Sequence, residues 1–218
     1  MMTYSSVVLI LLSALLAVLS PLGCAMEPDQ SDLDYAASPR VRIMYNNTGS
    51  SASNGQDPEV DDILIAMIDR AQVSVDVATM GFSRQEVIDA LVRAHERGVR
   101  VRFVGDGRHL EGFVDGYQTL EALNIPTAYG NMYHIMHDKF FVIDDRYVYT
   151  GTGNTTPTGF DRNDNNYVFI DSPDVATEFR DEFEQMLSGR FGSAKEVIDN
   201  GNTYQVGDTV IEVHWSPQ

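Results

Sequence analysis

Apolar side chains recur along residues 40–190 with two spacings, which predict alternating strands and helices. Alternating or continuous apolar residues indicate strands at Val41–Tyr45, Val73–Val77, Val99–Val104, His137–Ile143, Tyr147–Thr150 and Tyr167–Ile170. Apolar spacings of three and four residues indicate helices after Asp57-Pro58, from Ser83 to Gly98, over Tyr117–Leu123 and from Ser172-Pro173. This order predicts one α/β domain over residues 40–190, built on a mixed β-sheet flanked by helices.

Local signals predict where two of these helices begin and end. Ser83 and Glu86 have the spacing of a capping box, and Gly98 suits the left-handed residue that ends a helix. Ser172 followed by Pro173 is typical of a helix N-terminus, because the hydroxyl can cap the first turn and proline fits its first position.

The segment around residues 137–154 gathers an imidazole, an ammonium group and an amide around one apolar strand. His137 and Lys139 are two residues apart, so they share a face of an extended segment. The turn after Asp144 and the return strand bring Asn154 back beside His137. An imidazole nucleophile with cationic and amide donors nearby is suited to attack on phosphorus, where the donors hold the phosphate oxygens.

The spacing H-x-K-x-x-x-x-D, followed by G-T-G-N, resembles the signature of the phospholipase D superfamily of phosphodiesterases. The resemblance implies that His137 forms a covalent phosphohistidine and that Lys139, Thr152 and Asn154 bind the phosphate. It assigns Asp144 to the catalytic set, although a place at the strand end also suits a role in positioning the turn. It implies no metal ion or other cofactor.

Asn165 departs from the pattern of the superfamily, in which many members carry a glutamate that accepts a hydrogen bond from the nucleophilic histidine. An amide oxygen could still orient His137, but it adds no negative charge. The missing charge would weaken activity or come from elsewhere, with Asp161 and Asp164 the nearest candidates in sequence.

Residues 1–25 are expected to be an export signal, because an apolar run too short to span a bilayer precedes a processing site. Cys24 is the single cysteine, and it resembles the lipidated cysteine of bacterial lipoproteins. Cleavage after Ala25 would instead release a secreted protein. The acidic residues 26–39 are expected to be a flexible tether. The protein is therefore predicted to be exported, with membrane association through Cys24 as the favoured alternative.

Two other groups of residues could suggest a metal site or a ligand crevice, and neither is predicted to form one. His134, His137 and Asp138 resemble a metal cluster, but they do not share one helical face and no further Cys or His follows at a ligand spacing. No metal site is therefore predicted. Gly105-Asp106-Gly107 after a strand is interpreted as a turn rather than as part of a ligand crevice.

The net charge of −17 disfavours a polyanionic partner, because nucleic-acid binding depends on Lys and Arg residues that neutralise phosphates. It also disfavours an anionic membrane surface. Three functional classes remain. We favour hydrolysis of phospholipids, which suits an exported chain; the alternatives are an exported nuclease of the same superfamily and a catalytically weak phosphate-binding protein.

Residues 191–218 are interpreted as an extension of the domain. Val210–Pro217 resembles the strand that opens the second repeat in two-motif members of the superfamily, and it echoes Val41–Tyr45. One motif supplies one histidine, whereas protonation of the leaving oxygen normally uses a second. The chain is therefore expected to form half of a site, completed by a second copy in a homodimer or by a separate second half.

Overall fold

The computed structural model of the protein describes residues 40–46, 60–112, 114–197 and 201–216. The expected signal peptide, Cys24, the tether and the Asp57-Pro58 helix start lie outside these ranges. Within them, no helix combines the length and the apolar character needed to cross a membrane.

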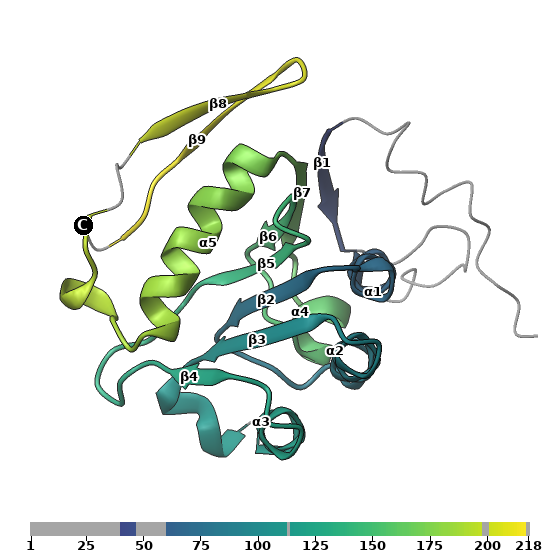
Figure 1. Ribbon diagram of the computed structural model, residues 1–218, viewed down its shortest axis with the longest axis vertical. Helices are drawn as coiled ribbons and strands as arrows, with labels where there is room; N and C mark the ends of the chain where they lie inside the picture. The colour runs from purple at the N-terminus through teal and green to yellow at the C-terminus, as the bar shows by residue number, and fades with distance from the viewer. Residues whose placement is uncertain (1–39, 47–59, 113, 198–200, 217–218) are drawn as a thin grey trace, which may run out of the picture. The chain divides into compact units, whose positions relative to one another are not determined.

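A seven-stranded sheet, in the order β1-β7-β6-β5-β2-β3-β4, forms the centre of the described chain (Figure 1). Its strands are β1 (Val41–Tyr45), β2 (Ser74–Thr79), β3 (Arg100–Gly105), β4 (Thr127–Tyr129), β5 (Lys139–Ile143), β6 (Tyr147–Gly151) and β7 (Asn166–Asp171). β2, β3 and β4 pair in parallel, whereas the pairs from β2 through β5, β6 and β7 to β1 are antiparallel. The predicted mixed sheet is confirmed. The short, half-buried β4 gave too little apolar pattern to be predicted.

Helices cover both faces of this sheet, as Figure 1 shows. One face carries α1 (Val60–Arg70), α2 (Gln85–Glu96), α3 (Val114–Ala122) and α4 (Pro157–Asp161), and the other carries α5 (Pro173–Leu187). The side chains of β5 divide between the two cores, because successive residues of a strand point to opposite faces. Phe141 and Ile143 pack with α1 and α2, whereas Phe140 and Val142 pack with α5.

The helix signals were right in two cases and wrong in one. Ser172 caps α5 through a bond from the Val175 N–H, and Gly98 has φ 87° just after α2, as predicted. The capping box at the start of α2 is wrong. The N-cap is Arg84, whose guanidinium has no acceptor for a side-chain cap, and the Ser83 N–H that Glu86 would have bound donates instead to the Thr155 carbonyl oxygen.

The C-terminal extension forms a hairpin of β8 (Asn202–Val206) and β9 (Thr209–Val213), a separate two-stranded sheet that lies over α5 (Figure 1). Glu178 of α5 accepts hydrogen bonds from the Tyr204 hydroxyl and, over 3.1 Å, from Trp215 Nε1. Glu178, Glu182 and Gln185 are all buried on the side of α5 that meets this extension. The outer side of α5 is therefore a covered polar surface rather than a solvated one.

Candidate active site

The two leading residues of the motif lie where β5 begins. Lys139 is the first residue of β5 and pairs in register with Thr79 at the end of β2. Its side chain is buried, and its Nζ donates a hydrogen bond of 2.7 Å to the carbonyl oxygen of His137. The Thr150 hydroxyl donates to the Lys139 carbonyl oxygen over 2.9 Å. These bonds fix the backbone that presents the exposed His137 imidazole.

Partial removal from water and neighbouring charges shift the pKa of both groups. Burial lowers the pKa of His137, and the nearby Lys139 ammonium lowers it further, while Asp138 and Asp106 oppose the shift. Burial also lowers the pKa of Lys139 from 10.5 to about 8, again against the attraction of Asp138 and Asp106. At neutral pH the imidazole is therefore unprotonated and nucleophilic, while the ammonium group remains mostly charged.

Asp106 belongs to the site, although the sequence suggested a simple turn. This fully buried carboxylate follows β3 and accepts from the Met136 N–H over 3.0 Å and from the Arg108 N–H over 2.7 Å. It thereby holds the residue that precedes His137. A carboxylate placed directly after a buried parallel strand was the signal that could have identified it.

The negative charge near His137 comes from Asp138 and Asp106. The candidates nearest to Asn165 in sequence do not supply it. Asp161 forms an ion pair of 3.0 Å with the arginine that precedes α2. Asp164 is exposed and is not among the charges that shift the pKa of His137.

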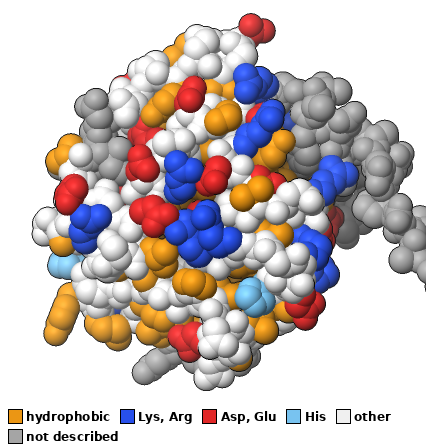
Figure 2. Space-filling model, viewed as in Figure 1, with side chains coloured by type: hydrophobic (Ala, Val, Ile, Leu, Met, Phe, Trp, Pro, Cys, Tyr) orange, Lys and Arg blue, Asp and Glu red, His pale blue; other side chains and the backbone are white. Residues whose placement is uncertain are grey.

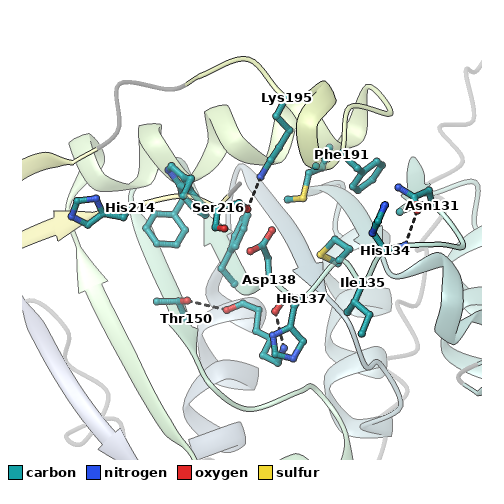
Figure 3. Close-up of a pocket in the computed structure, with 18 of the residues that line it drawn as sticks. Asn131, His134, Ile135, His137, Asp138, Thr150, Phe191, Lys195, His214 and Ser216 are labelled. Atoms are coloured by element: carbon teal, nitrogen blue, oxygen red, sulfur yellow. Dashed lines mark hydrogen bonds between the residues drawn. The ribbon is translucent and has the colours of Figure 1, made fainter. Parts of the chain in front are cut away.

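A cavity of about 1000 Å³ opens beside His137 and Lys139 (Figure 3). The loop before β5 contributes His134, and the segment after β9 contributes His214 and Trp215. His214 Nε2 lies 2.8 Å from Glu212 Oε1. The suggested metal cluster does not form: across the described ranges, no three His, Cys, Asp or Glu side chains gather as a metal site requires.

Thr152 and Asn165 bind each other and do not line the cavity. The Thr152 hydroxyl donates to Asn165 Oδ1 over 2.9 Å and accepts from the Asn166 N–H over 3.1 Å. Asn165 Nδ2 donates to the Gly159 carbonyl oxygen over 2.9 Å. Asn165 was expected to orient His137 and Thr152 to hold phosphate; the structure places both as supports of the loops after β6 and before β7.

Asn154 does not line the cavity either, but unlike Thr152 and Asn165 it has a buried side-chain atom without a partner among the described residues. Its side chain lies against Gly81, just beyond the end of β2, and Lys139 pairs with β2 at that same end. Its Oδ1 is buried and accepts no hydrogen bond from any residue that the structure describes. Because the amide oxygen and nitrogen are assigned from such bonds, this end of the amide can equally present a donor to a phosphate oxygen.

Asp144 lies at the opposite end of β5 from Lys139, about 17 Å along an extended chain. Its carboxylate accepts from the backbone N–H groups of Gln72, Val73 and Ser74 over 3.0, 2.7 and 3.1 Å. Its φ of 54° belongs to the turn into β6. Of the two roles open to Asp144, this geometry favours positioning, because the carboxylate joins this turn to the start of β2.

Comparison with known proteins finds relatives of the central part of the chain. The family described as "Cardiolipin synthase, PLD-like domain" matches residues 64–187. The mitochondrial cardiolipin hydrolase of Xenopus tropicalis is 28% identical over 123 residues, which cover 56% of this chain and 59% of that protein. The phospholipase D of Rickettsia felis is 30% identical over 112 residues, or 51% of this chain and 56% of that protein. The chain thus matches less than two thirds of the length of either relative.

Solved structures agree with the fold. The crystal structure of Nuc from Salmonella typhimurium, a phospholipase D family member, matches with a TM-score of 0.60 and 25% identity, covering 69% of this chain and 95% of that one. NucT from Helicobacter pylori matches with a TM-score of 0.50 and 20% identity, covering 68% and 96%.

Proposed function

This chain belongs to the phospholipase D superfamily, and from that premise we propose that it is a phosphodiesterase that cleaves phospholipids through a covalent bond between His137 and phosphorus. One observation carries the proposal. A buried ammonium group, Lys139, fixes the backbone of an exposed and unprotonated imidazole at the mouth of a cavity of about 1000 Å³.

In the proposed reaction, a ring nitrogen of His137 attacks phosphorus and an N–P bond forms as the bond to the leaving oxygen breaks. Lys139 and the Asn154 amide hold the non-bridging oxygens, whose negative charge they stabilise in the transition state. Water then attacks phosphorus and gives a proton to the group that had protonated the leaving oxygen, the N–P bond breaks, and the phosphate monoester and free His137 are released.

The leaving oxygen needs a proton, and His137 cannot supply it while it is bonded to phosphorus. We place the general acid on a second copy of the chain, in a homodimer whose two His137 side chains face one site. His134 and His214, which line the same cavity, are the alternatives within one chain.

The walls of the cavity favour a phospholipid over a nucleic acid. Phe179, Phe191 and Trp215 give it apolar surface, as the glycerol and acyl parts of a lipid require. Its lining includes no arginine, and its two lysines are Lys139 and Lys195, of which Lys195 is paired with a glutamate. On the face shown in Figure 2, basic side chains are interspersed with acidic ones and form no continuous tract for a polyanion.

Hydrolysis of bis(p-nitrophenyl) phosphate tests the chemistry. We expect the wild type to release p-nitrophenolate in the presence of EDTA, His137→Ala to abolish the release, and Asn154→Ala to reduce kcat severely. His95→Ala, on α2 and outside the cavity, is the matched control. Activity that EDTA removes and His137→Ala retains would contradict the phosphohistidine mechanism.

Phosphatidylcholine vesicles and single-stranded DNA, each at low and at physiological salt, test the substrate class. We expect hydrolysis of the lipid at both salt concentrations, and DNA cleavage that is weak and falls as salt screens the few cationic contacts. Efficient DNA cleavage at physiological salt without lipid hydrolysis would identify a nuclease instead.

A further inference from the structure

Three charged side chains meet behind the motif, on the α5 side of β5. Asp138 stands between His137 and Lys139 in sequence and lines the cavity together with Lys195 of the C-terminal extension. In Figure 3 the Asp138 carboxylate lies between His137 and Lys195, and the Lys195 side chain points toward it. The third member is Glu182 of α5.

Lys195 and Glu182 form a buried ion pair. The Lys195 ammonium donates to Glu182 Oε1 and, over 3.4 Å, to the Ser216 carbonyl oxygen. The Lys195 side chain is 5% exposed and that of Glu182 is 0% exposed. Glu182 Oε2 is buried without a hydrogen bond from any described residue. Lys195 is therefore committed to this buried site rather than to a ligand in solvent.

Lys195 is paired with Glu182 and also acts through its charge on Asp138, which lines the same cavity. Burial raises the pKa of Asp138, and the attraction of Lys195 is the largest opposing effect, followed by Lys139 and His137. Burial also raises the pKa of Glu182, which Lys195 opposes and Asp138 reinforces. Without Lys195, Asp138 and Glu182 would lose the cation that acts on both; Asp138 would keep only Lys139 and His137 nearby, and its pKa would rise further.

The ionised form of Asp138 matters to the nucleophile. Burial lowers the pKa of Lys139, and the attraction of Asp138 is the largest effect that raises it again. Asp138 also favours positive charge on His137, and such charge develops as the N–P bond forms. Asp106 acts on both groups as well. Asn165, where the superfamily pattern has a glutamate, accepts a hydrogen bond from the Thr152 hydroxyl through its amide oxygen and adds no charge.

We propose that Lys195 is a positioning residue of the active site: it keeps Asp138 ionised and in place, so that Asp138 supplies the negative charge that Asn165 does not. This inference rests on the proposed function and deepens it. Lys195 lies outside residues 64–187, the part of the chain that the family match covers. The C-terminal extension is thereby part of the site, since it carries this counter-ion. The chain contains only two lysines, and both line this cavity.

The test compares pH profiles of kcat/KM for bis(p-nitrophenyl) phosphate. Lys195→Met removes the largest effect that opposes the raised pKa of Asp138, so Asp138 is ionised less readily and supports the Lys139 ammonium less; we expect the alkaline limb to move to lower pH and kcat/KM at pH 8 to fall severalfold. Lys195→Arg restores the cation and should restore the limb. Asp138→Asn should reproduce the Lys195→Met profile, and combining the two should add little, because both remove one interaction.

Two variants separate this role from a general loss of structure. The double variant Glu182→Gln/Lys195→Met removes the whole buried ion pair, which a fold tolerates better than a single unpaired charge. Its alkaline limb should lie at the same lower pH as in Lys195→Met. Arg190→Met breaks the exposed pair of 2.8 Å between Arg190 and Glu196 in the same segment and should leave the profile unchanged. An unshifted alkaline limb in a folded Lys195→Met or in the double variant overturns the inference.

The inference and the proposed function fail in distinguishable ways. If His137→Ala retains full activity, the proposed function is wrong. If His137→Ala is inactive and Lys195→Met keeps the wild-type profile, only the role of Lys195 is wrong. A direct readout needs no turnover: the NMR titration of Lys139 Nζ should move to lower pH in Lys195→Met, and an unmoved titration again overturns the inference.

Discussion

The pH dependence of activity follows from the burial of Lys139. Its pKa of about 8 lies well below the ordinary 10.5 of a lysine. If only the charged ammonium stabilises the transition state, kcat/KM falls as pH rises through that value. From pH 7 to pH 9 the charged fraction drops from about nine tenths to about one tenth, so kcat/KM should fall about tenfold. An ordinary lysine would show no such fall below about pH 9.

On the acid side of the profile kcat/KM rises with pH, and this limb comes from His137 rather than from Lys139. His137 must be unprotonated to attack, and its pKa is lowered from 6.5. Activity should therefore rise with pH in a range below 6.5 and be complete by neutral pH. The profile of kcat/KM is thus expected to be a bell with its maximum between these two limbs.

The assay should use bis(p-nitrophenyl) phosphate, because p-nitrophenolate leaves without a proton and the general acid then does not shape the profile. Lys139→Arg is the decisive variant. A guanidinium group stays charged throughout the assay range, so the alkaline limb should disappear even though the altered geometry lowers the maximum. An alkaline limb that persists near pH 8 in Lys139→Arg would refute the assignment to Lys139.

Three further predictions concern other parts of the chain. Asp144→Ala should lower the free energy of unfolding by about 2–4 kcal/mol, because three backbone N–H groups lose their acceptor, while kcat/KM of the folded fraction stays unchanged; denaturant titration beside kinetics checks both. Gly153→Ala should destabilise by about 1–3 kcal/mol, measured by thermal unfolding, since the new Cβ would lie 1.9 Å from Tyr167 Oη. In cells of the host, Cys24→Ser should shift the protein from the detergent fraction to the soluble fraction, or leave its signal segment uncleaved. If the wild type does not incorporate a palmitate analogue, lipidation is rejected.

Strong periodic signals predicted the sheet because most of its strands have an unambiguous environment. β5 is buried on both faces, and its continuous apolar run between turn residues is what such a strand requires, whereas β2 was predicted from alternating valines although it too is buried on both faces. β4 and the buried polar side of α5 were not predictable in this way. Glu178 and Glu182 have the spacing of a solvated helix surface, and only the hairpin that packs over α5 makes them buried.

The motif places His137 and Lys139 together beside the cavity, but Asp144, Thr152 and Asn165 lie elsewhere, where they support turns and loops. The spacing from His137 to Asp144 fixes a distance along the strand, and a strand carries residues seven apart to opposite ends of the sheet. The supporting carboxylates could not be found from this spacing. Asp106 follows β3, a different strand from the one that carries the motif. The proposed role of Asp138 depends on Lys195, which is remote in sequence.

Composition held one signal about this site that does not depend on any motif. Among fifteen Lys and Arg residues only Lys139 and Lys195 are lysines, and both line the cavity. Arginine stays charged in any protein environment, so it suits the ion pairs that join surface elements, such as Arg93 with Asp69. A lysine responds to burial by losing affinity for its proton, which makes its charge dependent on neighbouring acids. At this cavity burial lowers the pKa of Lys139 to about 8 while Asp138 and Asp106 oppose the shift, so the charge that is sensitive to its surroundings lies beside the nucleophile.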